Sequence, residues 1–139
     1  MAVEFDAKRQ GRIVLVADDS RTIREMIVFF LKKAGYTVFA AENGRELLSL
    51  LNRIQPRVIV LDAEMPEMDG YETCARIRQT HPDLKAPVIF FTSQNSTESL
   101  FKAKGAKADD YIVKPFNPEG LVERVDRWAI RNSLHQPTV

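Results

Sequence analysis

Two apolar runs in the sequence end directly in carboxylates. Asp18 and Asp19 follow the run VLVA, and Asp62 follows the run VIVL. An unpaired carboxylate at the edge of an apolar core is costly, and several carboxylates together repel one another. The sequence therefore predicts a cation among these three acids, and their oxygen ligands suit Mg²⁺ or Mn²⁺.

Two later apolar runs end in groups that could hold an anion. The run PVIFF ends in Thr92 and Ser93, and the run DYIV is followed by Lys114 and Pro115. The lysine supplies a flexible positive charge, and the threonine supplies a hydroxyl donor. A carboxylate beside a metal ion, an ammonium group and a hydroxyl can attack a phosphoryl group and form an acyl phosphate. These residues therefore predict phosphoryl-transfer chemistry.

The elements that must position these groups alternate along the chain. Apolar and β-branched runs predict strands at 12–17, 36–41, 57–62, 86–93 and 110–114. Apolar residues at helical spacing predict helices, counted from their caps, at 20–35, 43–54, 70–79, 95–104 and 117–132. Ser20, Asn43 and Asn117 are suitable N-caps for three of these helices, and Gly35 suits the end of the first.

Five such β-α units predict one α/β domain with a parallel sheet and helices on both faces. In open sheets of this kind, ligands collect at the carboxyl ends of the strands. The strand order 2-1-3-4-5 makes strands 1, 3, 4 and 5 neighbours. The acids, the hydroxyls and the lysine would then meet at one edge of the sheet.

Length and composition set limits on the remaining functions. The chain has 139 residues and a net charge of +1, without the basic surplus typical of nucleic-acid binders. No window approaches the roughly 20 apolar residues of a membrane span, and we expect a cytoplasmic protein without a signal peptide. Cys74 is the single cysteine, so neither an internal disulfide nor a multi-cysteine metal site is expected, and it reads as a core residue.

Four motifs, in this order, resemble the receiver domain of two-component response regulators, of the chemotaxis type: VLVADDS, VIVLDAEMPEMDGYE, PVIFFTS and DDYIVKPF. The resemblance covers residues 11–131, which leaves 1–10 as an N-terminal extension and 132–139 as a tail. It implies a flavodoxin-like, doubly wound (βα)5 fold with a five-stranded parallel sheet. The order 2-1-3-4-5 is that of chemotaxis receivers, so its prediction comes with the resemblance.

The resemblance implies a role for each group. Asp62 would accept a phosphoryl group from the phosphohistidine of a sensor histidine kinase or a phosphotransfer protein. The metal ligands would be Asp18, Asp19, Asp62 and the backbone carbonyl of Glu64. The phosphate would be bound by Thr92, Ser93 and Lys114, the switch residues would be Thr92 and Tyr111, and the Lys114–Pro115 peptide would be cis.

The family's output surface would comprise helix 4, strand 5 and helix 5, with Phe101, Lys102 and Tyr111 on it. A downstream protein, rather than nucleic acid or a membrane, would bind there. Whether the chain also forms a homodimer on activation is an open question at this point. No multiple-turnover activity on another substrate is expected, so the chain is not predicted to be an enzyme. One departure is Lys107, at a place before strand 5 where receivers commonly have glycine.

Two other functions stay open. A haloacid-dehalogenase-like phosphohydrolase also uses an aspartate at a strand end with Mg²⁺, but it needs a second aspartate two residues later, and here that residue is Glu64. A degenerate receiver would be a binding module that works without phosphorylation. A nucleotide-binding fold is disfavoured, because no glycine-rich loop follows the first strand.

Overall fold

The structure is a computed structural model that describes residues 3–93, 105 and 108–131. Its sheet has five parallel strands: β1 (Ile13–Ala17), β2 (Thr37–Ala41), β3 (Val58–Asp62), β4 (Val88–Thr92) and β5 (Asp110–Val113). The strand order is β2-β1-β3-β4-β5. Both the parallel sheet and the predicted order 2-1-3-4-5 are therefore confirmed.

The described helices are a short 3₁₀ turn (Ala7–Arg9), α1 (Arg21–Ala34), α2 (Gly44–Leu51), α3 (Gly70–Thr80) and α5 (Pro118–Asp126), which continues into a π-helical turn (Arg127–Arg131). Each predicted helix is present except the one at 95–104, which lies outside the described residues, as do Phe101, Lys102 and Lys107. Among the described residues, no helix is both long and apolar enough to cross a membrane.

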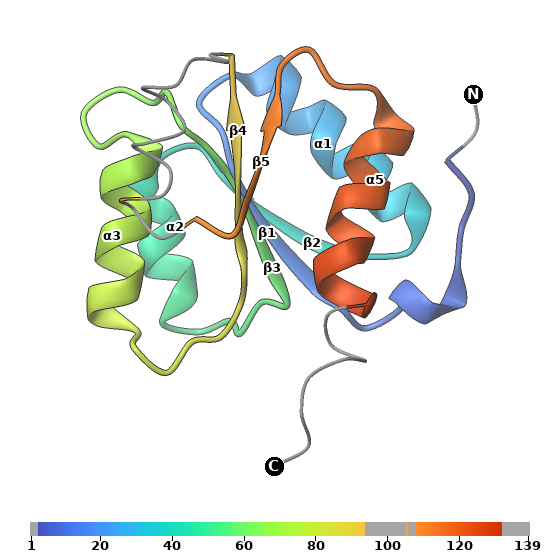
Figure 1. Cartoon of the computed structure of the whole chain (residues 1–139), viewed down its shortest axis with the longest axis horizontal. Coiled ribbons are helices and arrows are strands. Elements are labelled where there is room, and N and C mark those ends of the chain that lie inside the picture. Colours follow the sequence, from blue (N-terminus) through green and yellow to red (C-terminus); the bar gives the residue numbers. More distant parts are fainter. Residues whose placement is uncertain (1–2, 94–104, 106–107, 132–139) are drawn as a thin grey trace.

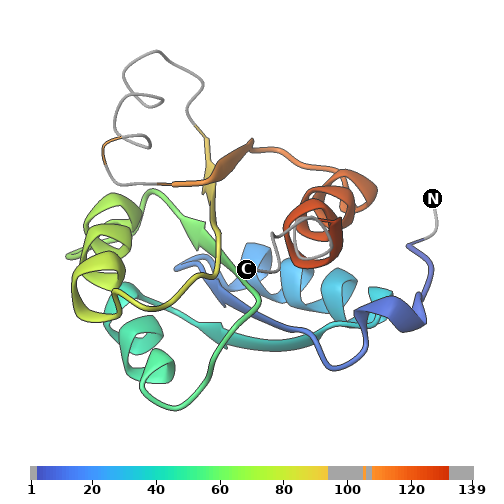
Figure 2. The ribbon, with the colours of Figure 1, turned by 60° about the horizontal axis from the view of Figure 1, so that its bottom comes forward.

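The sheet lies between two layers of helices (Figures 1 and 2). Helices α1 and α5 cover one face, and α2 and α3 cover the other. The pleat of β1 divides its side chains between two cores, because successive residues of a strand point to opposite faces. Val14 and Val16 pack under α1 and α5, whereas Leu15 and Ala17 pack under α2 and α3. Strands β3 and β4 are buried along their whole length, as their continuous apolar sequences predict.

The helix starts are fixed by local side chains. The three predicted caps are confirmed: Ser20, Asn43 and Asn117 accept hydrogen bonds from backbone N–H groups in the first turns of α1, α2 and α5. Asp69 caps α3 in the same way and accepts from the N–H of Glu72 at 2.8 Å. The spacing of Asp69 and Glu72 is that of a capping pair. No cap was predicted for this helix from the sequence.

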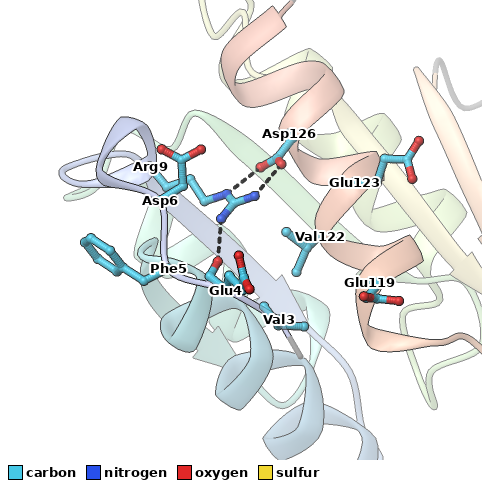
Figure 3. A pocket seen from close by; sticks show the side chains of 9 residues that line it. All are labelled: Val3, Glu4, Phe5, Asp6, Arg9, Glu119, Val122, Glu123 and Asp126. Atoms are coloured by element: carbon cyan, nitrogen blue, oxygen red, sulfur yellow. Dashed lines mark hydrogen bonds and ion pairs between the residues drawn. The ribbon is translucent and has the colours of Figure 1, made fainter. Parts of the chain in front are cut away.

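The segment predicted as an N-terminal extension packs against the domain (Figure 3). Val3 is 5% exposed and belongs to the core between α1 and α5. Arg9 donates two hydrogen bonds to the carboxylate of Asp126 in α5, at 2.9 and 2.7 Å. The hydroxyl of Tyr36 donates to the same carboxylate at 2.5 Å. The segment and α5 line a cavity of about 420 Å³, and the Arg9–Asp126 ion pair forms part of its wall.

Candidate functional site

Strand register brings the predicted site residues to one edge of the sheet. Ala17 of β1 is paired with Leu61 of β3, so Asp18 and Asp62 are the next residues along two neighbouring strands. Thr92 of β4 is paired with Val113 of β5, which places Lys114 just beyond the next strand end. The backbone N–H of Lys114 donates to the carbonyl of Thr92 at 2.7 Å, extending this ladder by one bond.

The three aspartates form one cluster at this edge. Asp18, Asp19 and Asp62 each offer a carboxylate oxygen, and these oxygens lie within 4.8 Å of one another. Asp18 is 1% exposed and Asp62 is 2% exposed, whereas Asp19 faces solvent. Two of the acids are thus withdrawn from water, and the third is open to it.

Lys114 is the cation that faces this cluster in the described part of the chain. Its Nζ lies 3.3 Å from Oδ1 of Asp62 and 3.9 Å from Oδ2 of Asp18. The ammonium group also lies 5.2 Å from the centre of the Phe91 ring, within the range of a cation–π contact. The peptide bond between Lys114 and Pro115 is cis.

One lysine does not balance the buried acids. Burial, and then the charge of Asp18, raise the pKa of Asp62 to about 8, although the N–H of Glu64 and the ammonium of Lys114 favour its ionised form. Burial also raises the pKa of Asp18, against a hydrogen bond from the N–H of Ser20. Without a further positive charge, the cluster therefore resists full ionisation at neutral pH.

The residues present fit a divalent metal ion. Oδ2 of Asp18 is buried, and no described residue forms a hydrogen bond with it. Carboxylate oxygens of this kind, two buried and one open to water, are the hard ligands that Mg²⁺ prefers, and the open side leaves room for the waters it keeps. Asp18, Asp19 and Asp62 could hold the ion, with the backbone carbonyl of Glu64 as a further oxygen.

Two neighbours hold the backbone of the site in place. Arg24 of α1 donates from its guanidinium to the carbonyl oxygen of Asp18 at 2.8 Å. Gly70, at the start of α3, donates to the carbonyl of Ala63 at 3.0 Å. A Cβ atom at position 70 would lie 2.7 Å from Cα of Ala63 and would also overlap the carbonyl of Asp62. Only glycine lets α3 begin this close to the strand end.

The acids that crowd the sequence after Asp62 separate in the structure. Glu67 is exposed and has a positive φ of 68°, within a tight turn in which the N–H of Met68 donates to the carbonyl of Pro66. Asp69 caps α3. Only Glu64 turns back toward the site, and it accepts a hydrogen bond from the hydroxyl of Thr92 at 2.9 Å.

The two predicted switch residues occupy different surroundings. Thr92 is buried, and its hydroxyl is bonded to Glu64. Tyr111 is half-buried in β5, paired in register with Phe90, and packs on the core under α2 and α3. Ser93 is exposed and joins Thr92 on the Glu64 carboxylate. The sequence pattern did not predict this arrangement. The resemblance to receiver domains assigned the backbone carbonyl of Glu64 to the metal and placed its side chain at a position that tunes the lifetime of the phosphoryl group, without naming a contact to Thr92.

Known proteins share this fold. A sequence model described as the response regulator receiver domain matches residues 14–126. Chemotaxis protein CheY4 of Vibrio cholerae superposes with a TM-score of 0.80 at 36% identity, covering 84% of this chain and 98% of that one. The receiver domain of a histidine kinase from Syntrophus aciditrophicus gives a TM-score of 0.81 at 31% identity, covering 93% and 97%.

The chain therefore belongs to the response regulator receiver domain family and is the receiver domain of a two-component response regulator. Among its relatives, response regulator MprA of Mycolicibacterium vanbaalenii is 40% identical over 112 residues, 81% of this chain and 48% of the relative. The probable transcriptional regulator ycf27 of Porphyridium aerugineum is 36% identical over 132 residues, 90% of this chain and 54% of the relative. The chain spans about half the length of these relatives.

Proposed function

We propose that Asp62 accepts a phosphoryl group from a histidine kinase or phosphotransfer protein in a Mg²⁺-dependent reaction. The observation that carries this proposal is the pairing of a buried Asp62 with Lys114 at 3.3 Å, beside the carboxylates of Asp18 and Asp19. Receiver domains of response regulators interact with histidine kinases and with downstream effectors. Membership of the family therefore supports both a phosphoryl donor and a downstream partner for this chain.

The reaction forms one bond and breaks one. A carboxylate oxygen of Asp62 attacks phosphorus, the bond from phosphorus to the donor's imidazole nitrogen breaks, and the imidazole leaves with that electron pair and takes a proton. Asp62 must be ionised to attack, and Lys114 favours its ionised form. Bound Mg²⁺ would supply the positive charge that neutralises the oxygens of the transferred group. Asp18, Asp19, Asp62 and the carbonyl of Glu64 would hold the ion.

The product would act as a switch. An acyl phosphate on Asp62 adds roughly two negative charges beside Lys114 and Thr92. We propose that Thr92 and Tyr111 rearrange in response and alter the surface around β5 and α5, where a downstream protein binds. Their movement shifts the equilibrium between two conformations that this surface already adopts, as ligands do in other switch proteins.

Labelling with acetyl [³²P]phosphate tests the site. The wild-type chain should incorporate label with Mg²⁺ and lose the signal in EDTA, and Asp62→Asn should abolish labelling. Asp69→Asn is the matched control, because it removes an exposed carboxylate of the same loop while asparagine still caps α3. Label that persists in Asp62→Asn, or that resists EDTA, would overturn the assignment.

The same experiment tests whether the chain is a phosphoacceptor or an enzyme. We propose one phosphoryl group per chain and no multiple turnover of a phosphomonoester. Incorporation should therefore level off at or below one mole per mole of chain. Steady release of phosphate from p-nitrophenyl phosphate would instead identify a phosphohydrolase.

A further inference from the structure

We propose that the Glu64 carboxylate is a positioning residue that restrains the site before phosphorylation, by holding the hydroxyl of Thr92 on itself. This inference rests on the proposed function. Oε1 of Glu64 accepts three hydrogen bonds from the end of β4: from the Thr92 hydroxyl at 2.9 Å, the Ser93 hydroxyl at 3.1 Å and the Ser93 N–H at 3.3 Å. We call this arrangement the Glu64 latch.

The latch uses hydrogen bonds to a carboxylate at the partly exposed end of β4. Hydrogen bonds to an ionised acceptor are roughly twice as strong as those between neutral groups. Glu64 is half-buried, and its other oxygen, Oε2, is buried without a hydrogen bond from any described residue. Within the described part of the chain, one oxygen of the side chain is therefore buried without a donor, while the other accepts all three hydrogen bonds. Burying an unsatisfied carboxylate oxygen costs free energy, which supports a functional role for this side chain.

The latch competes with the phosphoryl group for the same proton. Thr92 carries one hydroxyl hydrogen, so it can donate to one acceptor at a time. Its donation to an oxygen of the phosphoryl group on Asp62 requires the bond to Glu64 to break. Lys114 meets no such competition, because its ammonium already lies against Asp62 and Asp18. Activation therefore costs the free energy of breaking the hydrogen bond between Thr92 and Glu64, and the side chain at position 64 determines how large that cost is.

Beryllofluoride binding with Mg²⁺, followed by ¹⁹F NMR, isolates this cost from the chemistry of transfer. Glu64→Ala removes the acceptor and should lower the beryllofluoride dissociation constant about tenfold, or 1.4 kcal/mol. Glu64→Gln keeps an oxygen acceptor without the charge and should give a smaller gain. Both variants keep the backbone carbonyl. Glu67→Gln, an exposed carboxylate of the same loop, is the charge-matched control and should change binding less than twofold.

A second comparison separates the latch from simple charge. In a Thr92→Val background the hydroxyl is gone, so Glu64→Ala should no longer improve binding. The side-chain rotamer of Thr92, measured from three-bond couplings in the ligand-free protein, should be single in the wild type and averaged in Glu64→Ala. This reading needs neither beryllofluoride nor catalysis, and it tests the latch even if Thr92→Val binds too weakly to measure.

Each outcome decides one statement. Unchanged or weaker beryllofluoride binding by a folded Glu64→Ala, or a gain that persists without the Thr92 hydroxyl, overturns the latch and leaves the proposed function intact. An unchanged Thr92 rotamer in Glu64→Ala also overturns it. A wild-type chain that neither binds beryllofluoride nor accepts label would overturn the proposed function instead, while the rotamer measurement still reports on the latch.

Discussion

Replacing Asp62 by asparagine should stabilise the metal-free protein, and the gain should grow with pH. In the folded chain, burial and the charge of Asp18 raise the pKa of Asp62 from 3.8 to about 8. Asparagine has nearly the same shape, can still accept from Lys114 and the N–H of Glu64, and carries no charge. The substitution therefore removes a buried carboxyl group that is costly to ionise, and it keeps most of the contacts that this group makes.

The sign follows from counting protons. Between pH 3.8 and about 8 the folded state keeps the Asp62 proton, whereas the unfolded chain has lost it. The folded state then binds more protons, so the free energy of unfolding falls as the pH rises and levels off above the folded pKa. The slope for one full proton is about 1.4 kcal/mol per pH unit. Between pH 6 and 8 the wild type should lose about 2 kcal/mol relative to Asp62→Asn.

Urea unfolding in EDTA at pH 5, 6, 7 and 8 measures this difference for the two proteins. Because both contain the same other titrating groups, the difference between their curves reports Asp62 together with its electrostatic interaction with Asp18. Mg²⁺ should then narrow the gap, because an ion that binds only the folded wild type stabilises it by about 2.7 kcal/mol at 100 times its dissociation constant. A variant no more stable than the wild type at pH 8, or a gap that shrinks with rising pH, would refute the reasoning.

Four further predictions test the site, the loop after it and the N-terminal segment. Asp19→Ala should weaken Mg²⁺ binding more than tenfold by calorimetry, whereas Glu67→Gln should leave it unchanged; equal effects would misplace the metal. Glu67→Gly should raise the free energy of unfolding by up to about 1 kcal/mol, because glycine adopts the φ of 68° without strain. Gly70→Ala should lower the free energy of unfolding by more than about 2 kcal/mol, because the added methyl group would overlap the backbone at the end of β3. Arg9→Ala should cost about 2–3 kcal/mol, because it leaves the carboxylate of Asp126 largely buried without its guanidinium partner; a loss below 0.5 kcal/mol would show that the N-terminal segment is only loosely attached.

The strands, and the acids at their ends, could be predicted because they follow from local rules, whereas the strand order came with the resemblance to receiver domains. Continuous apolar runs identify buried parallel strands, and such strands carry their ligands at their carboxyl ends. Once β1 and β3 are neighbours, Asp18 and Asp62 must lie together whatever the side chains around them do. The caps at Ser20 and Asn43 are equally local, since each bond spans three residues.

Side-chain contacts that do not follow from the strand order could not be predicted. Arg9 and Asp126 are 117 positions apart, and the segment around Arg9 has no hydrophobic period that would mark it as part of the core. The same holds for Glu64 and Thr92, which are 28 positions apart. A glutamate two residues after a strand end can point to solvent, to a metal or to a neighbouring strand, and only packing decides among these.

Stability and function pull in opposite directions at this edge of the sheet. Gly70 lets α3 start against the backbone of Asp62, a residue that is itself buried. Burial raises the pKa of Asp62 and so destabilises the metal-free fold at neutral pH. The same unmet demand for positive charge makes a metal ion favourable there, and with it an incoming phosphoryl group. Selection for stability alone would therefore replace Asp62 first, so the retention of a buried, poorly compensated acid is itself an argument that the chain uses it.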